Sequence, residues 1–517
     1  MKTTSHHLLI ASLLVLLSSC GTTESIRTVS DLRRAEGPVL LLGVDGSRYK
    51  ANVSYVGQEF LVGSGTVADS SGTRPFADTI RYSSLTHIIG SEGMGVLGYA
   101  IVIPVAAVTV LGAANGLSQN PSASATEYAP GGGSCPLVMS WNGESWVLEG
   151  EAVGTALGRG LETETGTILP HLTETGGEVR MALVNNRPET HSIDRLKLMA
   201  VRHGGEEVIL DPLHQPWLSP ASIPADVAFD ESGADILPSL AKVDGERWTG
   251  APRGSAGAGP YTDELIAEFD VPSADKEIGI SVRARNTRLA AVALQYLYSI
   301  LGDEVADFIA AADEDAEMIS LLCRWLDESS LRVSVLTRGG WRNAGTIQPE
   351  AVEADFERIV RVRLPAEHGP RVRVKLSMIH DGWMIDAVRL HSGIRRPDVS
   401  QEMPLELVSR PAWDMIPSTV FTKDGRYDIL LPGDTVVVAA RAVEPHSKKT
   451  SYILYTTGYL HEWPEASAGV TRNARGSSGL TPRLSALKML MRTPENLLPM
   501  IYERWEEVEN KRGMTED

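Results

Sequence analysis

Residues 371–376 read Arg-Val-Arg-Val-Lys-Leu, an uninterrupted alternation of basic and apolar side chains. Successive side chains of a β-strand point to opposite faces, so the alternation puts the three basic residues on a wet face and the three apolar residues on a buried face. Residues 361–364, Arg-Val-Arg-Leu, repeat the pattern. We therefore predict a half-buried antiparallel sheet with a solvated basic face, in a chain that is mainly β.

Similar β patterns extend on both sides of this stretch. We expect strands at 178–185, 195–202, 264–269, 277–285, 331–336, 359–364, 372–379, 384–391, 426–443 and 451–459. Apolar residues at helical spacing over 289–326 predict a helical insertion, and a further helix is expected over 494–511, with Thr493 as N-cap and Pro494 at its first position. These patterns predict β-sandwich-like domains with a helical insertion and a C-terminal helix.

The N-terminal part has its own β signals. Strands are expected at 39–44, 48–56, 60–63 and 79–82, with turns at Asp45-Gly46 and Gly57-Gln58. Short strands at this spacing are typical of a small antiparallel barrel or sandwich.

Length and linker composition set the domain boundaries. A chain of 517 residues is too long for one core and indicates roughly three domains. A Ser, Asn, Pro and Gly-rich linker gives the clearest boundary. The expected division is 1–19 signal peptide, 20–92 small β domain, 93–117 apolar segment, 118–133 linker, 134–286 β domain, 287–327 helical insertion, 328–463 β domain, and 464–517 linker and C-terminal helix.

The N-terminus predicts lipidation. Lys2 precedes the apolar run Leu8–Leu17, which is too short to span a bilayer and fits a cleavable signal peptide. The run ends at Leu17-Ser18-Ser19-Cys20, which resembles the bacterial lipobox. The resemblance implies a mature chain that begins at lipidated Cys20, in the cell envelope, with its ectodomain facing the periplasm or the exterior.

A second membrane signal conflicts with the first. Met94–Ala114 is apolar and long enough to span a bilayer, and Gly112 and Gly116 have the spacing of helix packing in lipid. One crossing would place everything after Asn115 in the cytoplasm, whereas the arginines and lysines of 24–92 favour a cytoplasmic location for that part instead. We expect a lipid-anchored protein whose apolar segment associates with the membrane without moving the C-terminal part inside.

Cysteine use and charge restrict the remaining chemistry. Apart from Cys20 the chain has Cys135 and Cys323, which either form one disulfide in the oxidising envelope or leave Cys323 as a buried free thiol in an apolar helix. Neither has a Cys-x-x-Cys partner. The 66 acidic and 48 basic residues give a net charge of −18, which argues against nucleic acid as a partner.

The glycines at 93, 95 and 98 match the dinucleotide fingerprint formally, but no acidic residue follows before Glu127. We therefore predict no cofactor.

Two tryptophans flank the strongest turn signal. Trp141 and Trp146 lie on either side of Asn142-Gly143, which predicts a two-residue hairpin. The two rings either pair across the strands or form a platform for a carbohydrate ligand. The ligand-binding hypothesis requires that Trp141, Trp146, Trp341 or Trp383 line an exposed groove.

Catalytic motifs are sparse. The twelve histidines show no H-E-x-x-H spacing, and G-x-S-x-G is missing. His171 and His380 are the most suggestive loop histidines, although each is also typical of a turn. A hydrolase would need a cleft that gathers one of them with two carboxylates. No metal ligands or catalytic residues are predicted.

A wider resemblance concerns the main body. The stretches 135–143, 158–162, 169–172 and 185–190 are similar to a large-ectodomain family of bacterial lipoproteins without assigned activity. It covers roughly residues 134 to 463 and implies class and compartment only. We expect a non-catalytic interaction or structural role in the envelope, with an envelope protein as partner; a ligand-binding module is the alternative and a hydrolase the third hypothesis.

Overall fold

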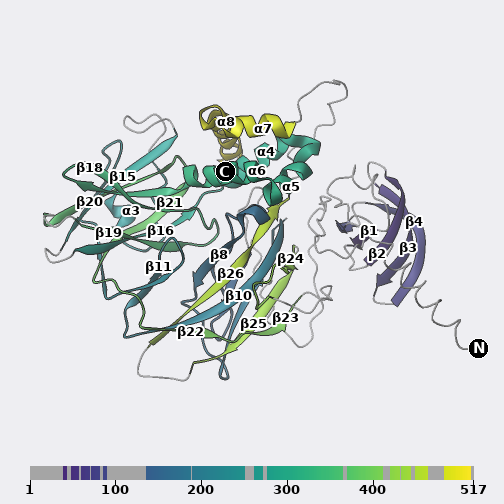
Figure 1. The fold of residues 1–517 in the computed structure, drawn as a ribbon, viewed down its shortest axis with the longest axis horizontal. Helices are drawn as coiled ribbons and strands as arrows, with labels where there is room; N and C mark the ends of the chain where they lie inside the picture. Colours follow the sequence, from purple (N-terminus) through teal and green to yellow (C-terminus); the bar gives the residue numbers. More distant parts are fainter. Residues whose placement is uncertain are drawn as a thin grey trace, which may run out of the picture. The chain divides into compact units, whose positions relative to one another are not determined.

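The computed structural model describes strand segments 39–43, 48–56, 60–69, 72–81 and 85–89, and residues 136–513 except 188, 251–260, 272–275, 365–368, 411–419, 431, 444–448 and 464–482. The chain divides into two compact units, one holding the N-terminal strands and the other all elements from β6 onward (Figure 1). The expectations for Cys20, Met94–Ala114, the linker 118–133 and Cys135 lie outside the described residues. None of the described helices combines the length and apolarity needed to cross a membrane.

The N-terminal unit contains a five-stranded antiparallel sheet, as the fold class predicts. Its strands are β1 (Val39–Gly43), β2 (Arg48–Val56), β3 (Phe60–Asp69), β4 (Gly72–Arg81) and β5 (Leu85–Ile89), in the order β4-β3-β2-β1-β5. The hairpin β3–β4 is longer than its apolar pattern predicts, because pairing continues from Phe60↔Arg81 to Asp69↔Gly72. Ala51, Val67 and Ile80 are buried.

The first sandwich of the larger unit packs two antiparallel sheets face to face. One sheet contains β23 (Glu406–Ser409), β25 (Thr435–Arg441), β9 (Glu178–Val184), β6 (Leu137–Trp141) and β7 (Trp146–Glu151), in that order. The other contains β22 (Val399–Met403), β10 (Glu189–His203), β26 (Lys449–Glu462) and β8 (Thr163–Ile168), with β24 (Asp428–Leu430) also paired to β10. Met181 of β9, Val438 of β25, Leu198 of β10 and Leu454 of β26 belong to the core between them.

The longest pairing in this sandwich joins distant parts of the chain. Strands β10 and β26 pair from Glu189↔Glu462 to His203↔Lys449, with a bulge between Ile193 and Arg195. Most of the chain between the two strands builds a second sandwich and a set of helices. The second sandwich is therefore an insertion into the first.

The second sandwich also has two sheets. Their orders are β12 (Pro216–Ser219), β11 (Glu207–Leu210), β19 (Phe356–Arg363), β16 (Glu277–Asn286), β21 (Trp383–Ser392), β13 (Ala221–Pro224); and β14 (Val227–Asp230), β15 (Thr262–Asp270), β20 (Arg371–Ile379), β17 (Leu331–Thr337), β18 (Gly340–Ile347). Strands from residues 134–286 and strands from residues 328–463, which were expected in two successive domains, therefore belong to the same sheets. The helical turn α3 (Leu237–Leu240) contributes Leu240 to the core.

Helices from two parts of the chain form one layer. Its members are α4 (Leu289–Leu301), α5 (Val305–Glu314), α6 (Ala316–Ser329), α7 (Arg483–Met491) and α8 (Pro494–Gly513). The short helical turn η4 (Gly302–Glu304) joins α4 to α5, and η3 (Arg159–Leu161) contacts α5 and α6. The helical insertion expected over 289–326 as two helices contains three, because η4 divides the first run into α4 and α5; α8 was also expected, whereas α7 was not. Leu294, Phe308, Leu322, Leu487 and Tyr502 share one core, so α7 and α8 cover the helical insertion.

The predicted cap of α8 is wrong in one respect. Pro494 is the first helical residue, as expected. The hydroxyl of Thr493, however, donates to the carbonyls of Met489 and Leu490 at the end of α7. The side chain therefore satisfies the preceding helix and not α8.

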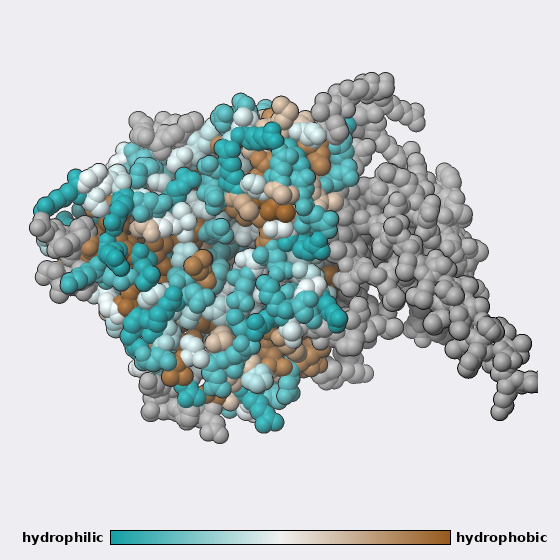
Figure 2. All heavy atoms as spheres, in the orientation of Figure 1, coloured by the Kyte–Doolittle hydropathy of each residue, from teal (hydrophilic) through white to brown (hydrophobic). Residues whose placement is uncertain are grey.

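The basic stripe is a solvated sheet face, as predicted. Arg371 and Arg373 are exposed, whereas Val372, Val374 and Leu376 are buried. Cross-strand acids on β15 accept the basic side chains: Asp270 pairs with Arg371, Glu268 with Arg373, and Glu264 with Lys375. The face of the larger unit shown in Figure 2 is mainly hydrophilic, with small separated hydrophobic patches.

We predict that Gly458→Ala destabilises the first sandwich. A Cβ at Gly458 of β26 would collide with the backbone carbonyl oxygen of Ser192, which the β10–β26 ladder holds in place. We expect the free energy of unfolding to fall by about 1–3 kcal/mol. Urea denaturation followed by tryptophan fluorescence measures this loss. The control is Gly339→Ala, whose nearest neighbour is the Thr337 hydroxyl at 3.8 Å and which should be nearly neutral. Equal midpoints for the two variants would contradict the prediction.

Candidate functional site

A polar cleft of about 640 Å³ lies between the two sandwiches. The first sandwich contributes residues of β7 and β8, the loop 169–172 and the start of β26. The second contributes β11, Arg283 of β16, and the segment 350–358 that leads into β19. We refer to this cavity as the inter-sandwich cleft.

One rim of the cleft carries a histidine oriented by a carboxylate. The Glu149 side chain is only 1% exposed, and its Oε2 lies 2.9 Å from Nδ1 of His171, whose ring is 57% exposed. Glu149 Oε1 also accepts the backbone N–H of His171 and the hydroxyl of Ser140. A proton on Nδ1 would leave Nε2 as an acceptor, because the neutral ring has one donor and one acceptor nitrogen.

These three residues do not form a serine-protease relay. In such a relay the histidine lies between the serine and the acid, whereas here Glu149 lies between Ser140 and His171. Ser140 is also fully buried. The arrangement fixes an imidazole beside the cleft and supplies no nucleophile.

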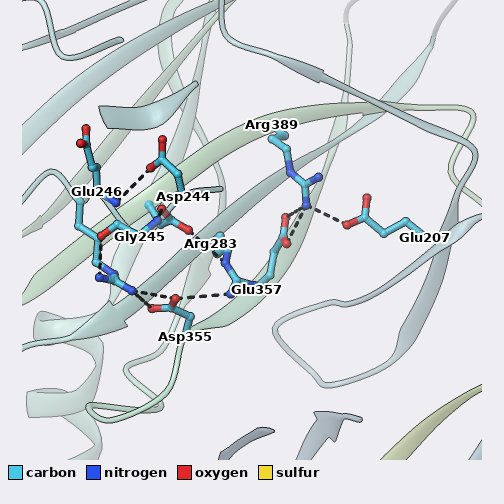
Figure 3. A network of polar contacts seen from close by, with 10 residues as sticks. Glu207, Asp244, Gly245, Glu246, Arg283, Asp355, Glu357 and Arg389 are labelled. Atoms are coloured by element: carbon cyan, nitrogen blue, oxygen red, sulfur yellow. Dashed lines mark hydrogen bonds and ion pairs between the residues drawn. The ribbon is translucent and has the colours of Figure 1, made fainter. Parts of the chain in front are cut away.

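Arginine pairs hold most of the cleft carboxylates. Arg389 donates to both oxygens of Glu357, at 2.7 and 2.8 Å, and to Glu207 at 2.9 Å (Figure 3). Burial lowers the pKa of Arg389, but the two glutamates raise it overall above its usual value. The guanidinium therefore bridges β11, β19 and β21 as a permanent cation.

A second arginine network lies beside the first in Figure 3. Asp355 accepts Arg247 through both oxygens, at 2.9 and 3.0 Å, and lies 3.4 Å from Arg283. Arg283 also donates to the buried Asp386 at 3.2 Å, and Asp386 accepts the backbone N–H of Gly245. Branched networks of this kind fix side chains that would otherwise be free to rotate.

Arg358 cross-links the two sandwiches at the floor of the cleft. Its guanidinium pairs with Glu350, with an Nε–Oε1 distance of 2.7 Å, and donates to the carbonyl of Gly166 in β8. Burial raises the pKa of Glu350 and Arg358 opposes the shift. The same guanidinium lies 3.1 Å from Nδ1 of His214, whose pKa falls to about 3, mainly through burial and then through Arg358.

A second cross-link uses backbone amides. Glu151, at the end of β7, accepts the consecutive N–H groups of Val352, Glu353 and Ala354 through one carboxylate oxygen. Arg187 adds an ion pair to Glu353. The segment that forms one wall of the cleft is thus tied to the first sandwich by charge-assisted hydrogen bonds.

The predicted tryptophan site is built as a hairpin. Trp141 and Trp146 are opposite one another on β6 and β7, with ring centroids 5.6 Å apart and an interplanar angle of 63°. Trp141 and Trp383 are buried, and Trp341 lies on β18 in another sheet. None of the four tryptophans lines the inter-sandwich cleft.

The second loop histidine is also part of the fold. His380 Nδ1 lies 2.6 Å from Asp263 and both side chains are buried. The His380 carbonyl accepts the hydroxyl of Tyr502, so this corner anchors α8 to the second sandwich. Of the two histidines, the cleft gathers His171 with carboxylates, which is the arrangement that the hydrolase hypothesis required.

Cys323 lies on α6 and is exposed, so the expected burial of this side chain is wrong. The residue falls on the outer side of an amphipathic helix whose buried face includes Leu321 and Leu322. Its pairing with Cys135 stays a prediction, because Cys135 lies outside the described residues.

Sequence reasoning missed the main wall residues of the cleft. Glu149, Glu151, Glu350 and Arg358 belong to segments with ordinary charge content. They form a site only because the fold brings these distant segments together. A weak signal was available in Glu149 and Glu151, which place two acids on or next to a hydrophobic strand.

We predict that Arg358→Met destabilises the chain by about 3–5 kcal/mol, because it leaves the buried Glu350 without its cation. The double variant Arg358→Met, Glu350→Gln should recover much of this loss. Chemical denaturation of the four proteins of the double-mutant cycle measures the coupling. Additive effects of the two substitutions would show that the pair does not act as a unit.

Acid should weaken the fold through buried neutral histidines. Burial lowers the pKa of His191 and of His214 to about 3 and that of His391 to about 4. In the unfolded chain these imidazoles bind protons near pH 6.5, whereas in the folded chain they stay neutral at that pH. The free energy of unfolding therefore has its highest value above pH 7 and falls as the pH drops from 6.5 towards 4. The loss is about 1.4 kcal/mol per pH unit for each histidine.

Unfolding midpoints measured between pH 7.5 and 4.5 test this expectation. His391→Asn should make the dependence shallower, because one of the three buried imidazoles is then removed. A midpoint that stays constant from pH 7 to pH 5 would refute it.

Comparison with known proteins gives no family. No family model and no curated protein matches the chain. Solved structures with some similarity include the infectious bursal disease virus Gt strain, at 9% identity and TM-score 0.12, covering 68% of this chain and 93% of that chain. The VP2 subviral particle of infectious bursal disease virus aligns at 7% identity and TM-score 0.11, covering 94% and 92%. Similarity this low carries no argument about fold or function.

Proposed function

We propose that the protein is a lipid-anchored bacterial envelope protein whose β-rich ectodomain has a non-catalytic interaction role. The observation that supports it best is how the cleft acids are held. Glu207, Glu350, Glu353, Asp355 and Glu357 each accept a guanidinium donor. These ion pairs occupy the carboxylate oxygens and hold the walls of a rigid, preformed cavity. Such an arrangement suits ligand binding more than proton transfer.

The N-terminus supports the anchor and the compartment. Leu17-Ser18-Ser19-Cys20 fits lipidation at Cys20, and the ectodomain would then face the periplasm or the exterior. The proposed partner is another envelope protein. A small polar ligand in the inter-sandwich cleft, such as a carbohydrate, is the alternative occupant.

Metabolic labelling with a palmitate analogue tests the anchor. We expect label on the wild type, none on Cys20→Ala, and cleavage of residues after 134 when intact spheroplasts are treated with protease. Label that persists in Cys20→Ala, or a C-terminal part protected until lysis, would contradict the proposal.

A second candidate, an envelope hydrolase, is favoured by one observation. The cleft contains His171, held by the buried Glu149, so its Nε2 is available as a general base. A panel of chromogenic ester and glycoside substrates tests it. Turnover that His171→Gln abolishes and the exposed control Glu174→Gln retains would favour the hydrolase. No turnover by the wild type would favour binding.

A further inference from the structure

A second cavity lies where the helical layer meets the two sandwiches, and its lining is mainly apolar. It measures about 110 Å³ and is bounded by α4, α6, the loop 154–157 and the segment 349–352, all within the larger unit. We refer to this cavity as the helix-layer pocket. Its buried apolar lining includes Leu294, Leu297, Leu322, Met491 and Leu497.

Polar side chains in the lining are already engaged within the protein. Asn286 donates to one backbone carbonyl and accepts one backbone N–H. The hydroxyls of Thr287 and Ser329 donate to backbone carbonyls, and Glu462 accepts the side-chain amide of Gln295 at 2.8 Å. A polar ligand would therefore lose hydrogen bonds to water that the pocket replaces poorly, whereas a hydrocarbon group would lose none.

The walls of the pocket are tied to the sandwiches and do not close on the space. One wall is fixed because the backbone of Leu460 in β26 hydrogen-bonds to Ala156 and to Gly158. The segment 349–352 is held where Glu151 accepts its last backbone N–H at 2.9 Å. How far a cavity collapses depends on how freely its walls relax. Walls tied in this way keep a preformed space for a guest.

Strained backbone adjoins one of these walls. Val153, immediately before the loop 154–157, has a φ of 51°, which a β-branched residue rarely adopts. The residue is fully buried, and its N–H donates to the hydroxyl of Thr165 at 3.1 Å. Strain of this kind persists only where the surrounding structure holds it, and it clusters at ligand-binding sites. It is a sign of a site that does not depend on the cavity volume.

We propose that the helix-layer pocket is a binding site for one ring-sized hydrocarbon group of a small molecule. Apolar cavities of about 150 Å³ stay dry and bind benzene. The pocket, at about 110 Å³, accepts a single ring or a short branched alkyl group and is too small for a long acyl chain. Ala290, the exposed residue of the lining, marks the entry.

The pocket shares a wall with the inter-sandwich cleft. Glu350 and Ala351 line both cavities, and the amides that follow them are the ones that Glu151 accepts. A guest in the pocket restricts this segment and so stiffens one wall of the cleft. The proposal goes beyond the proposed function, and it depends neither on lipidation of Cys20 nor on what occupies the cleft.

Titration calorimetry with toluene and with phenol tests the pocket in the full chain carrying Cys20→Ser. The two probes have nearly the same shape and differ by a methyl group in place of a hydroxyl. We expect toluene to bind at one site with a dissociation constant at least tenfold lower than that of phenol. Hydrogen–deuterium exchange then locates the site, because amides in peptides covering 286–297 and 349–354 should slow at least threefold with toluene.

Matched variants separate this pocket from any other apolar site. Ala293→Leu should abolish toluene binding, because Ala293 is a buried lining residue of α4 and the larger side chain fills the space. Ala290→Leu blocks the entry from an exposed position, so it tests the same site without altering the core. The control is Ala316→Leu, at an exposed alanine of α6 outside the lining, which should bind toluene normally. Thermal midpoints show that each variant is folded.

Several results would overturn the proposal. Failure of toluene to bind would make the pocket a packing void only, and equal affinity for phenol would remove its selectivity for hydrocarbon. Binding that both Ala293→Leu and Ala290→Leu retain would place the site elsewhere. Slower exchange at 286–297 without any change at 349–354 would remove the link to the cleft. Failure of palmitate labelling at Cys20 would overturn the proposed function alone, since the titration uses a chain without that cysteine.

Discussion

The pairing of β10 with β26 is the constraint on which the rest of the larger unit depends. The two strands form one continuous ladder although the whole second sandwich lies between them in the chain. One face of this ladder packs against the other sheet of the first sandwich, through Leu198 and Leu454. The other face carries Val201 and Ile453, which contact Val208 and Leu210 of the second sandwich. The ladder therefore lies in the core of one sandwich and at the junction with the next.

The cleft follows from this junction. The two sandwiches contact each other through a small apolar cluster and leave space beside it, and polar groups must line that space if water enters. Arg358, Glu151 and Arg187 cross the space and fix its width. The arginines and acids of Figure 3 then stiffen the wall on the side of the second sandwich. The geometry of the site is a consequence of how the sandwiches meet.

Local patterns predicted most of the long strands but not the pairing of distant ones, and they missed the strands β8, β11, β12, β13, β14, β18, β22 and β23. The alternation at 371–376 placed β20 and its wet face correctly, because period two is a property of one strand alone. The division into successive domains at 134–286 and 328–463 followed chain order, whereas β16 pairs with β19 and β21 across the helical insertion. Pairing between distant strands depends on packing that no short window contains. Helix α7 was missed for a similar reason. Its buried residues Leu487 and Met491 are too few to form a recognisable helical pattern, and they are buried because they pack in the core of the helical layer.

The candidate site divides in the same way. His171 was predicted as a loop histidine of interest, and the structure gives it a buried carboxylate partner twenty-two residues away. Trp383 was predicted from its type alone, and it is a core residue that donates to the Ser329 carbonyl. A histidine in a loop is informative because polar loops line cavities, whereas a tryptophan is as useful inside a core as on a surface.

The inserted topology also fixes an order of events during synthesis. Residues 207–392 contain every strand of the second sandwich, so its sheets can close while the chain is still emerging. The first sandwich has no such freedom. Its long strand β10 is made early and must wait for β26, and β9, although it already has β6 on one side, lacks its other neighbour until β25 is made. During that interval the edge of β10 that pairs with β26 in the folded protein has no strand beside it. A holding chaperone, or export of the chain before it folds, would protect this edge until the last strands are made.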